Sequence, residues 1–353
     1  QLPIIFQGSR YAQRLPIGTV EVLETFSHEA IRRFYKDWYR PDLMTVVAVG
    51  DFDPAEMENT IREHFSGIAG PADPRPRDYY DVPGHAETLF AIASDREATT
   101  SQVTIMYKQG VDDDNTLAGY REMMAESLVT SMLNARLFEL SQQEDPPFAG
   151  GGAGQGRFVR TSEFFQLGAL VPDGGLPMGM AALLTEAERV ARFGFLPSEL
   201  EREKANRLRG MEQAYNEREN IPSASLAGEI VRHVLQGESM PGIEFEYRAA
   251  QRLLPTITTD DVNRIAGSWL TEENRVVMVN SPEKEGLAVP TEAELASVFE
   301  AVLAQELEPY EDSTPEEPLV PQAPAPGAVV SRDSLRELNI TEWTLANDVR
   351  IVM

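Results

Sequence analysis

The sequence predicts an α+β fold, and three observations support this prediction. Amphipathic helix patterns alternate along the chain with short β-branched runs that are typical of strands. Apolar residues make up 42% of the 353 residues and charged residues 25%, so a sizeable core can be buried. Two segments, residues 26–51 and 259–280, share one pattern, in which a helix ends near a tryptophan and a polar turn leads to a strand.

The first part of the chain contains clear local signals. Ser27 is a good capping residue, and the apolar periodicity that follows predicts a helix over residues 27–38. The apolar run Thr45–Val49 predicts a buried strand. Asp53 before Pro54 predicts the start of another helix, whose inner face would carry Met57, Ile61 and Phe65.

The rest of the chain repeats these patterns. We expect strands over residues 89–93, 103–107, 164–171 and 275–280. We expect helices over residues 115–142, 177–193, 198–219, 223–236, 259–269 and from 291. Ser198 with Glu201 has capping-box spacing, and Gly194 and Gly237 are candidate C-terminal caps. The β-prone stretches around Asn347-Asp348 predict a hairpin at the end of the chain.

Composition and charge exclude several classes of protein. The net charge is −26, which disfavours nucleic acid as a partner because phosphate backbones need a basic surface. The absence of cysteine excludes disulfides, thiolate metal sites and cysteine nucleophiles. No apolar run is long enough for a membrane span. The first residues lack both an initiator Met and the features of a signal peptide, so we expect the chain to begin inside a longer protein.

Several motifs resemble one known family. The segments Gly8–Gly18 and Phe34–Pro41 resemble the loop after the active site and the end of the first domain of insulinase/pitrilysin-type zinc metallopeptidases, which are inverted zincins. Leu133–Phe138 and Phe193–Leu200 are similar to segments of their second domain, and Trp343–Asp348 is similar to the opening hairpin of the third. The resemblance implies repeated mitochondrial-processing-peptidase-like α+β domains, each with a mostly antiparallel sheet and helices packed on one face.

The resemblance also implies a division of the chain. Residues 1–70 would be the C-terminal part of a first, catalytic-type domain, whose partial sheet would expose an unpaired edge. A linker would follow, then a complete second domain, a helix with a proline-rich acidic linker, and the opening hairpin of a third domain. These parts would span residues 71–84, 85–285, 286–330 and 331–353.

The implied activity is zinc-dependent hydrolysis of peptides or small proteins enclosed in a chamber. The family binds zinc through a His-x-x-Glu-His motif and a downstream Glu, with the motif Glu as general base. None of His28, His64, His85 and His233 begins that motif, and Arg32 stands where a second ligand after His28 would lie. We therefore expect no catalytic residue, metal ligand or zinc ion in this chain, with the ligands upstream in the parent protein.

Other polar and glycine-rich segments have two interpretations each. The run Gly150-Gly151-Gly152-Ala153-Gly154 is either a flexible loop or a loop that contacts substrate peptides through Gly150, Gly151, Gly152 and Gly154. Asp112-Asp113-Asp114 could suggest a calcium site, but it lacks the spacing of a calcium-binding loop, so the alternative interpretation is a solvated turn. Glu144-Asp145 is interpreted in the same way. Arg10 and Arg14 would anchor a loop near the chamber.

Two functions remain open at this level. The chain is either the chamber wall of an active peptidase or a non-catalytic scaffold or partner subunit of the same fold, since fold alone does not decide activity. For the first, we expect peptide substrates and zinc in the parent protein. Self-association through an unpaired sheet edge is a further expectation. A periplasmic location is implied only by the resemblance.

Overall fold

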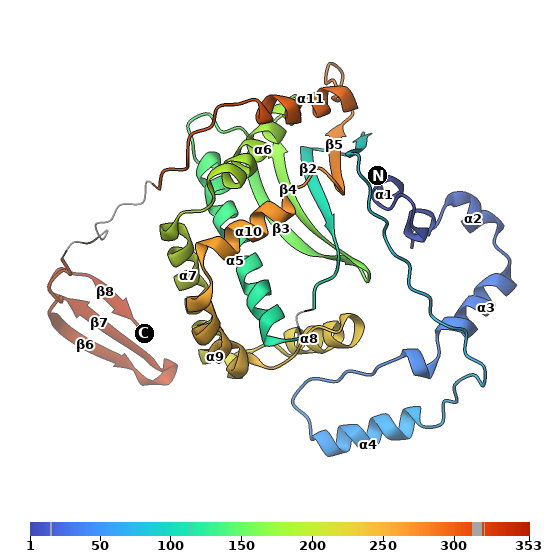
Figure 1. Ribbon diagram of the computed structural model, residues 1–353. Coiled ribbons are helices and arrows are strands. Elements are labelled where there is room, and N and C mark those ends of the chain that lie inside the picture. Colours follow the sequence, from blue (N-terminus) through green and yellow to red (C-terminus); the bar gives the residue numbers. More distant parts are fainter. Residues whose placement is uncertain (15, 114, 313–319, 321) are drawn as a thin grey trace. The chain divides into compact units, whose positions relative to one another are not determined.

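The computed structural model describes residues 1–14, 16–113, 115–312, 320 and 322–353. Two compact units make up the chain, residues 1–310 and 311–353. The larger unit contains a five-stranded sheet (Figure 1). Its strands are β1 (Leu89–Asp95), β2 (Ser101–Gln109), β3 (Gly150–Val159), β4 (Ser162–Val171) and β5 (Arg275–Pro282), in the spatial order β1-β5-β2-β4-β3. Only β1 and β5 run parallel, which confirms a mostly antiparallel sheet.

Helices cover one face of this sheet. The long helix α5 (Leu117–Ser141) lies along β3, and α6 (Leu176–Phe193) and α10 (Thr259–Trp269) pack beside it (Figure 1). Around them lie α7 (Pro197–Asn216), α8 (Ser223–Gln236), α9 (Ile243–Leu253) and α11 (Glu292–Leu303). The core between helices and sheet includes Leu128, Met132 and Leu167, each at most 2% exposed. The α+β prediction is therefore confirmed.

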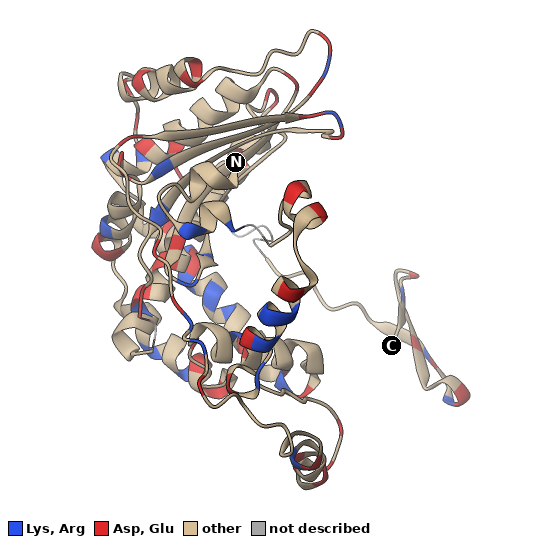
Figure 2. Ribbon diagram, turned by 90° about the vertical axis from the view of Figure 1, so that its right-hand side faces the viewer, with Lys and Arg blue, Asp and Glu red and all other residues tan. Residues whose placement is uncertain are grey.

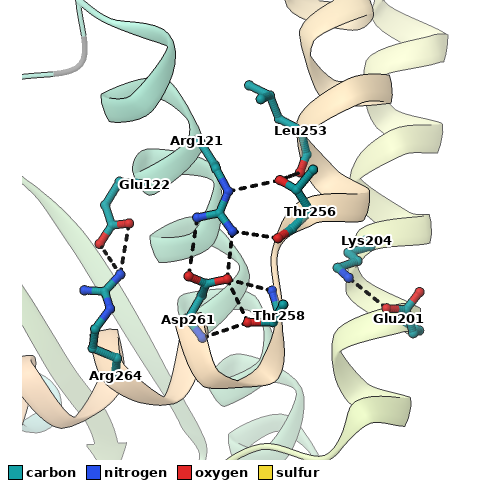
Figure 3. A network of polar contacts seen from close by, with 9 residues as sticks. All are labelled: Arg121, Glu122, Glu201, Lys204, Leu253, Thr256, Thr258, Asp261 and Arg264. Atoms are coloured by element: carbon teal, nitrogen blue, oxygen red, sulfur yellow. Dashed lines mark hydrogen bonds and ion pairs between the residues drawn. The ribbon is translucent and has the colours of Figure 1, made fainter.

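Polar clamps hold α10 against α5 (Figure 3). Arg121 of α5 donates to both carboxylate oxygens of Asp261 and to the carbonyl of Thr256, at 2.6–3.4 Å. Asp261 also accepts the backbone N–H of Thr258, completing a capping box at the start of α10. A second pair, Arg264 with Glu122, joins the same two helices at 2.7 Å. The two arginine–carboxylate pairs link residues 140 and 142 positions apart, so they belong to the tertiary structure.

The helix caps agree with the sequence in part. Gly194 and Gly237 end α6 and α8 with φ of 74° and 78°, as predicted. The predicted pairing of Ser198 with Glu201 is wrong, because α7 begins earlier, and Glu199 accepts the backbone N–H of Leu196 at 2.8 Å. Helix α9 was not predicted. It starts at Ile243, and its N-cap residue Gly242 has a φ of 84°, a conformation that favours glycine.

The other sheet face is only partly covered. The short helix α1 (Leu2–Ile5) packs Ile5 against Ala91, Met106 and Val276. The side-chain amide of Gln1 donates to two strand carbonyls at 2.8 Å, and buried Lys108 donates to the carbonyl of Ile5 at 3.3 Å. Phe158 of β3 and Phe164 of β4 also pack against this cluster, so among the described residues only the glycine-rich end of β3 and the part of β4 beside it have no helix over this face.

The segment after α1 forms helices but no sheet in its described part. These helices are α2 (Val20–Thr25), α3 (His28–Trp38) and α4 (Pro54–Phe65), and none has a buried residue. Ser27 and Asp53 cap α3 and α4 as predicted. The strand predicted at Thr45–Val49 is wrong, because a strand needs a hydrogen-bonded neighbour and no described residue supplies one. The predicted partial-sheet edge is therefore absent there, and Phe65 is 49% exposed rather than on a packed face.

The smaller unit is a three-stranded antiparallel sheet of β6 (Val329–Leu335), β7 (Ile340–Leu345) and β8 (Arg350–Val352). The predicted terminal hairpin is confirmed as β7 and β8, and Asp348 in its turn has a φ of 63°. Residues 313–319 and 321 of the proline-rich segment before β6 lie outside the described residues. No described helix is both long and apolar enough to cross a membrane.

Candidate functional site

The glycine run is a strand at the edge of the sheet. Both loop interpretations are corrected, because Gly150–Val159 pairs with β4 in antiparallel register, with Gly152 opposite Gly168. Among the described residues, no strand pairs with the outer edge of β3. The sequence signal was misleading because glycine disfavours strands in general, whereas here the next strand, β4, supplies the backbone partners that the glycines need.

The glycines of β3 have different surroundings. A Cβ at Gly151 would lie 2.7 Å from the ring of Phe148, which is 1% exposed, so glycine here makes room for core packing. A Cβ at Gly152 would lie 3.2 Å from the side-chain oxygen of Asn134. By contrast, Gly150 has no atom within 4 Å of that position, and Gly154 meets only Gln166 at 3.9 Å. Packing therefore explains why residue 151 is a glycine, but it does not explain the glycines at positions 150 and 154.

The open side of β3 and β4 forms a shallow groove of about 370 Å³. Its floor contains the glycines of β3 with Gly168, and its walls carry Gln102, Thr104 and Gln166. Charged residues of the sheet lie toward the strand ends, so the middle of this surface carries none (Figure 2). The arrangement is flat, polar and free of side chains over β3, which suits the close approach of another backbone.

Asn134 of α5 holds the middle of this strand. Its amide nitrogen donates to the carbonyl of Ala153 at 3.0 Å, and its amide oxygen accepts the N–H of Ala153 at 2.7 Å. The backbone groups of Ala153 are thus already satisfied by a side chain. Backbone groups alternate between the two sides of a strand, so the next groups on the outer side belong to Gly151 and Gln155. An incoming strand can pair there and must displace Asn134 to pair with Ala153 itself.

A buried ionic network positions α5. Arg136, 2% exposed, donates to both oxygens of Glu199 at 2.7 Å and to Glu186 at 3.0 Å. The ring of Tyr310 lies 4.1 Å from its guanidinium carbon. Arg136 thereby ties α5 to α6 and α7, two residues along from Asn134. The segment Leu133–Phe138 was singled out by resemblance, but its burial and partners follow only from the three-dimensional structure.

An acidic cavity of about 270 Å³ lies at the other end of β3. Asp112, Asp113, Glu122, Glu126 and Glu163 contribute to its lining. Burial raises the pKa of Glu126 to about 7, and the charges of Asp112, Glu122 and Glu163 add to that effect. Sequence reasoning missed Glu126 because its burial depends on the packing of α5. Asp114, the third residue of the predicted turn, lies outside the described residues.

The histidines are scattered over the larger unit. His28 and His64 are exposed on α3 and α4. The Nδ1 atoms of His85 and His233 lie 2.6 Å and 2.7 Å from the carbonyls of Glu87 and Glu238. Within the described ranges, no three His, Asp or Glu residues are arranged to hold a metal ion. These residues therefore do not fit a zinc site.

Comparisons with known proteins identify a family. The model of the "Peptidase M16 inactive domain" matches residues 25–207. The chain is 31% identical to a protein of Arabidopsis thaliana named "Zinc protease PQQL-like", over 99% of this chain and 34% of the plant protein. It is 25% identical to "Probable zinc protease PqqL" of Escherichia coli, over 99% of this chain and 38% of that protein. The chain thus spans about a third of the length of these relatives.

Solved structures share the fold. The crystal structure of the periplasmic protease PqqL from Escherichia coli has a TM-score of 0.80 at 21% identity, covering 99% of this chain and 39% of that one. A crystal structure of the ferredoxin protease FusC in complex with Arabidopsis ferredoxin has a TM-score of 0.71 at 22% identity, with the same coverage. The resemblance read from the sequence motifs is confirmed: the chain belongs to the M16, or insulinase-type, peptidase family and carries its inactive domain.

Proposed function

We propose that the parent protein is a zinc-dependent peptidase that encloses peptides, and that this chain forms part of the chamber wall. The relatives named zinc proteases are about three times as long as the matched segment, which leaves room for a zinc site elsewhere in the parent. Because the described residues do not fit zinc, the metal ligands are assigned to another part of the parent. The domain boundaries predicted from the sequence remain part of this proposal.

One observation carries the proposal, namely the open edge of β3 beside its glycine-lined groove. An extended peptide can add as a strand to such an edge, with main-chain hydrogen bonds providing affinity. Glycine at positions 150 and 154 lets that peptide approach the backbone closely. Peptides or small proteins are therefore the proposed ligands, and Gly150, Gly151, Gly152 and Gly154 form the proposed contact surface.

The test uses the full-length parent protein with Gly150→Val and Gly154→Val combined. A Cβ at Gly150 meets no atom within 4 Å, and one at Gly154 makes only an ordinary contact with Gln166 at 3.9 Å. The melting temperature should therefore stay unchanged while KM for long peptides rises about tenfold. Gly67→Val is the matched control, because its Cβ also meets nothing within 4 Å and it lies outside β3. An unchanged KM in the double variant would remove the groove from substrate binding.

A second measurement separates the peptidase from the scaffold alternative. Elemental analysis of the full-length protein should find about one zinc per chain, with chelator-sensitive peptide hydrolysis. The 353-residue chain alone should bind no stoichiometric zinc and hydrolyse no peptide. A parent that binds no zinc would favour a scaffold or partner subunit.

Location and self-association are lesser parts of the proposal. A periplasmic location for the parent is proposed from the structural likeness to a periplasmic protease. Self-association of the chain would use the β3 edge, since the described part of residues 1–70 contains no strand. Sedimentation should then show dimers at high concentration that a strand-matching peptide dissociates, whereas a strict monomer would exclude this mode.

A further inference from the structure

A separate cavity of about 490 Å³ lies in the N-terminal segment. It is formed by the 3-10 helix η1 (Arg10–Gln13), the outer side of α3 and the strap of residues 75–80. Its lining includes Arg10, Arg14, Arg33, Arg75, Asp37, Asp78, Phe34, Trp38 and Tyr80. Four guanidinium groups thus meet at one cavity in a chain with a net charge of −26. We call this cavity the arginine pocket.

Two of these arginines build the pocket. Arg75 pairs with Asp37 at 3.0 Å and lies over the ring of Trp38 at 5.2 Å. Arg10 lies over the ring of Tyr80 at 5.1 Å. Buried Arg40 donates to the carbonyl of Arg75 at 2.6 Å, which fixes the strap against α3. The walls of the pocket therefore have defined positions.

The other two arginines are available to a ligand. Arg14 and Arg33 are exposed, and the guanidinium group of neither has an ion pair or hydrogen bond with another described residue. Asp37 already pairs with Arg75, so Asp78 is the one lining carboxylate without an arginine partner. The pocket therefore carries an excess of positive charge. Guanidinium groups bind carboxylates with paired hydrogen bonds, more strongly than neutral partners do.

We propose that the arginine pocket binds an acidic group of a peptide, either an Asp or Glu side chain or a C-terminal carboxylate. A peptide fits better than an inorganic anion for two reasons. Phe34, which is 56% exposed, and Trp38 offer apolar and aromatic contact beside the arginines. Asp37 and Asp78 can accept peptide N–H groups, whereas they repel a bare phosphate.

The pocket is also tied to the sheet that carries β3. Thr161, in the turn between β3 and β4, donates to the carbonyl of Tyr80 at 2.7 Å. A ligand held in the pocket therefore lies on the same unit as the proposed peptide edge. The inference deepens the proposed function and rests on it for the peptide nature of the ligand. It adds a preference for acidic peptides.

The experiment measures peptide binding to the full 353-residue chain by titration calorimetry and tryptophan fluorescence, with Trp38 as a reporter inside the pocket. The probes are a short Glu-rich peptide and its Gln-substituted counterpart. The Glu-rich peptide should bind about tenfold tighter at low salt and lose that advantage as salt rises. Arg14→Gln combined with Arg33→Gln should abolish the difference while leaving circular dichroism and melting temperature unchanged, because both side chains are exposed.

Matched controls make each outcome decisive. Arg62→Gln combined with Arg96→Gln removes the same charge from exposed sites outside the pocket and should change affinity less than twofold. Equal affinity of the two peptides, an equal loss in the control variant, or inorganic phosphate binding as tightly as the Glu-rich peptide would each overturn the inference. If Gly150→Val with Gly154→Val weakens both peptides but the arginine variants do not, the proposed β3 function stands and the arginine pocket fails.

Discussion

Asn134 and Ala153 form a two-bond clamp between the longest helix and the edge strand, with hydrogen bonds of 3.0 Å and 2.7 Å. The side-chain amide of Asn134 takes the place that a neighbouring strand would occupy at Ala153. An exposed edge strand is prone to pair with other chains, so a side chain that satisfies its central residue limits unspecific pairing. The clamp leaves the open glycines on either side of Ala153 accessible.

Replacing Asn134 tests this clamp. Asn134→Ala should lower the free energy of unfolding by about 1–3 kcal/mol, because it leaves two partly buried backbone groups without a partner. Urea unfolding measures the loss, and hydrogen exchange at the Ala153 amide should accelerate. Asn206→Ala, at an exposed position of α7, is the control, with an expected change within about 0.5 kcal/mol. Equal effects of the two substitutions would contradict a specific clamp.

The glycines of β3 should respond differently to alanine. Gly151→Ala places a Cβ 2.7 Å from the buried Phe148 ring, so overpacking should cost about 1–3 kcal/mol. Gly150→Ala meets no atom within 4 Å and should change stability by about 0.5 kcal/mol or less, with either sign. Thermal unfolding of the two variants checks the contrast. A neutral Gly151→Ala would show that Phe148 can move.

The buried network around Arg136 should be sensitive to loss of its cation. Arg136→Met leaves Glu186 and Glu199 buried without their shared partner, and it should cost about 3–5 kcal/mol. Adding Glu186→Gln and Glu199→Gln to that variant should recover part of the loss, because no carboxylate is then stranded. Arg62→Met, in an exposed pair on α4, is the control at about 0.5 kcal/mol or less. A mild effect of Arg136→Met in urea titration would exclude a structural role for the network.

The raised pKa of Glu126 predicts that the free energy of unfolding depends on pH. Its folded-state pKa of about 7 lies above the unfolded value of 4.5, so the folded state binds this proton more tightly. The resulting stabilisation is fully present below pH 4.5 and is lost as the pH rises through about 7. Relative to wild type, Glu126→Gln should therefore gain stability between those values, on the order of 1 kcal/mol after allowance for solvent screening.

Urea unfolding at several pH values measures that gain. Glu63→Gln, on the exposed side of α4, is the control for removal of a surface charge. A stability difference between wild type and Glu126→Gln that stays constant from pH 4 to pH 8 would contradict the raised pKa.

Local signals in the sequence determined most helices and several strands. Caps such as Ser27 and Asp53 lie within three residues of the groups that they satisfy, so their role is visible without the rest of the fold. The long periodic pattern of α5 and the β-branched runs of β2 and β5 are similarly local, because burial repeats with the period of the element. The family resemblance also came from contiguous motifs.

Only the three-dimensional structure decided the elements whose stability comes from partners outside the segment itself. Thr45–Val49 has strand composition but no neighbour among the described residues, whereas the glycine run has poor strand propensity and becomes β3 because β4 pairs with it. The roles of Asn134 and Arg136 likewise depend on partners 19 and 63 positions away. The raised pKa of Glu126 depends on its burial in the folded chain and on charges such as Asp112 and Glu163. Backbone pairing, desolvation and charge compensation act between residues that meet only in the folded chain. The sequence therefore located the glycines of the candidate surface, but it could not predict the geometry of that surface.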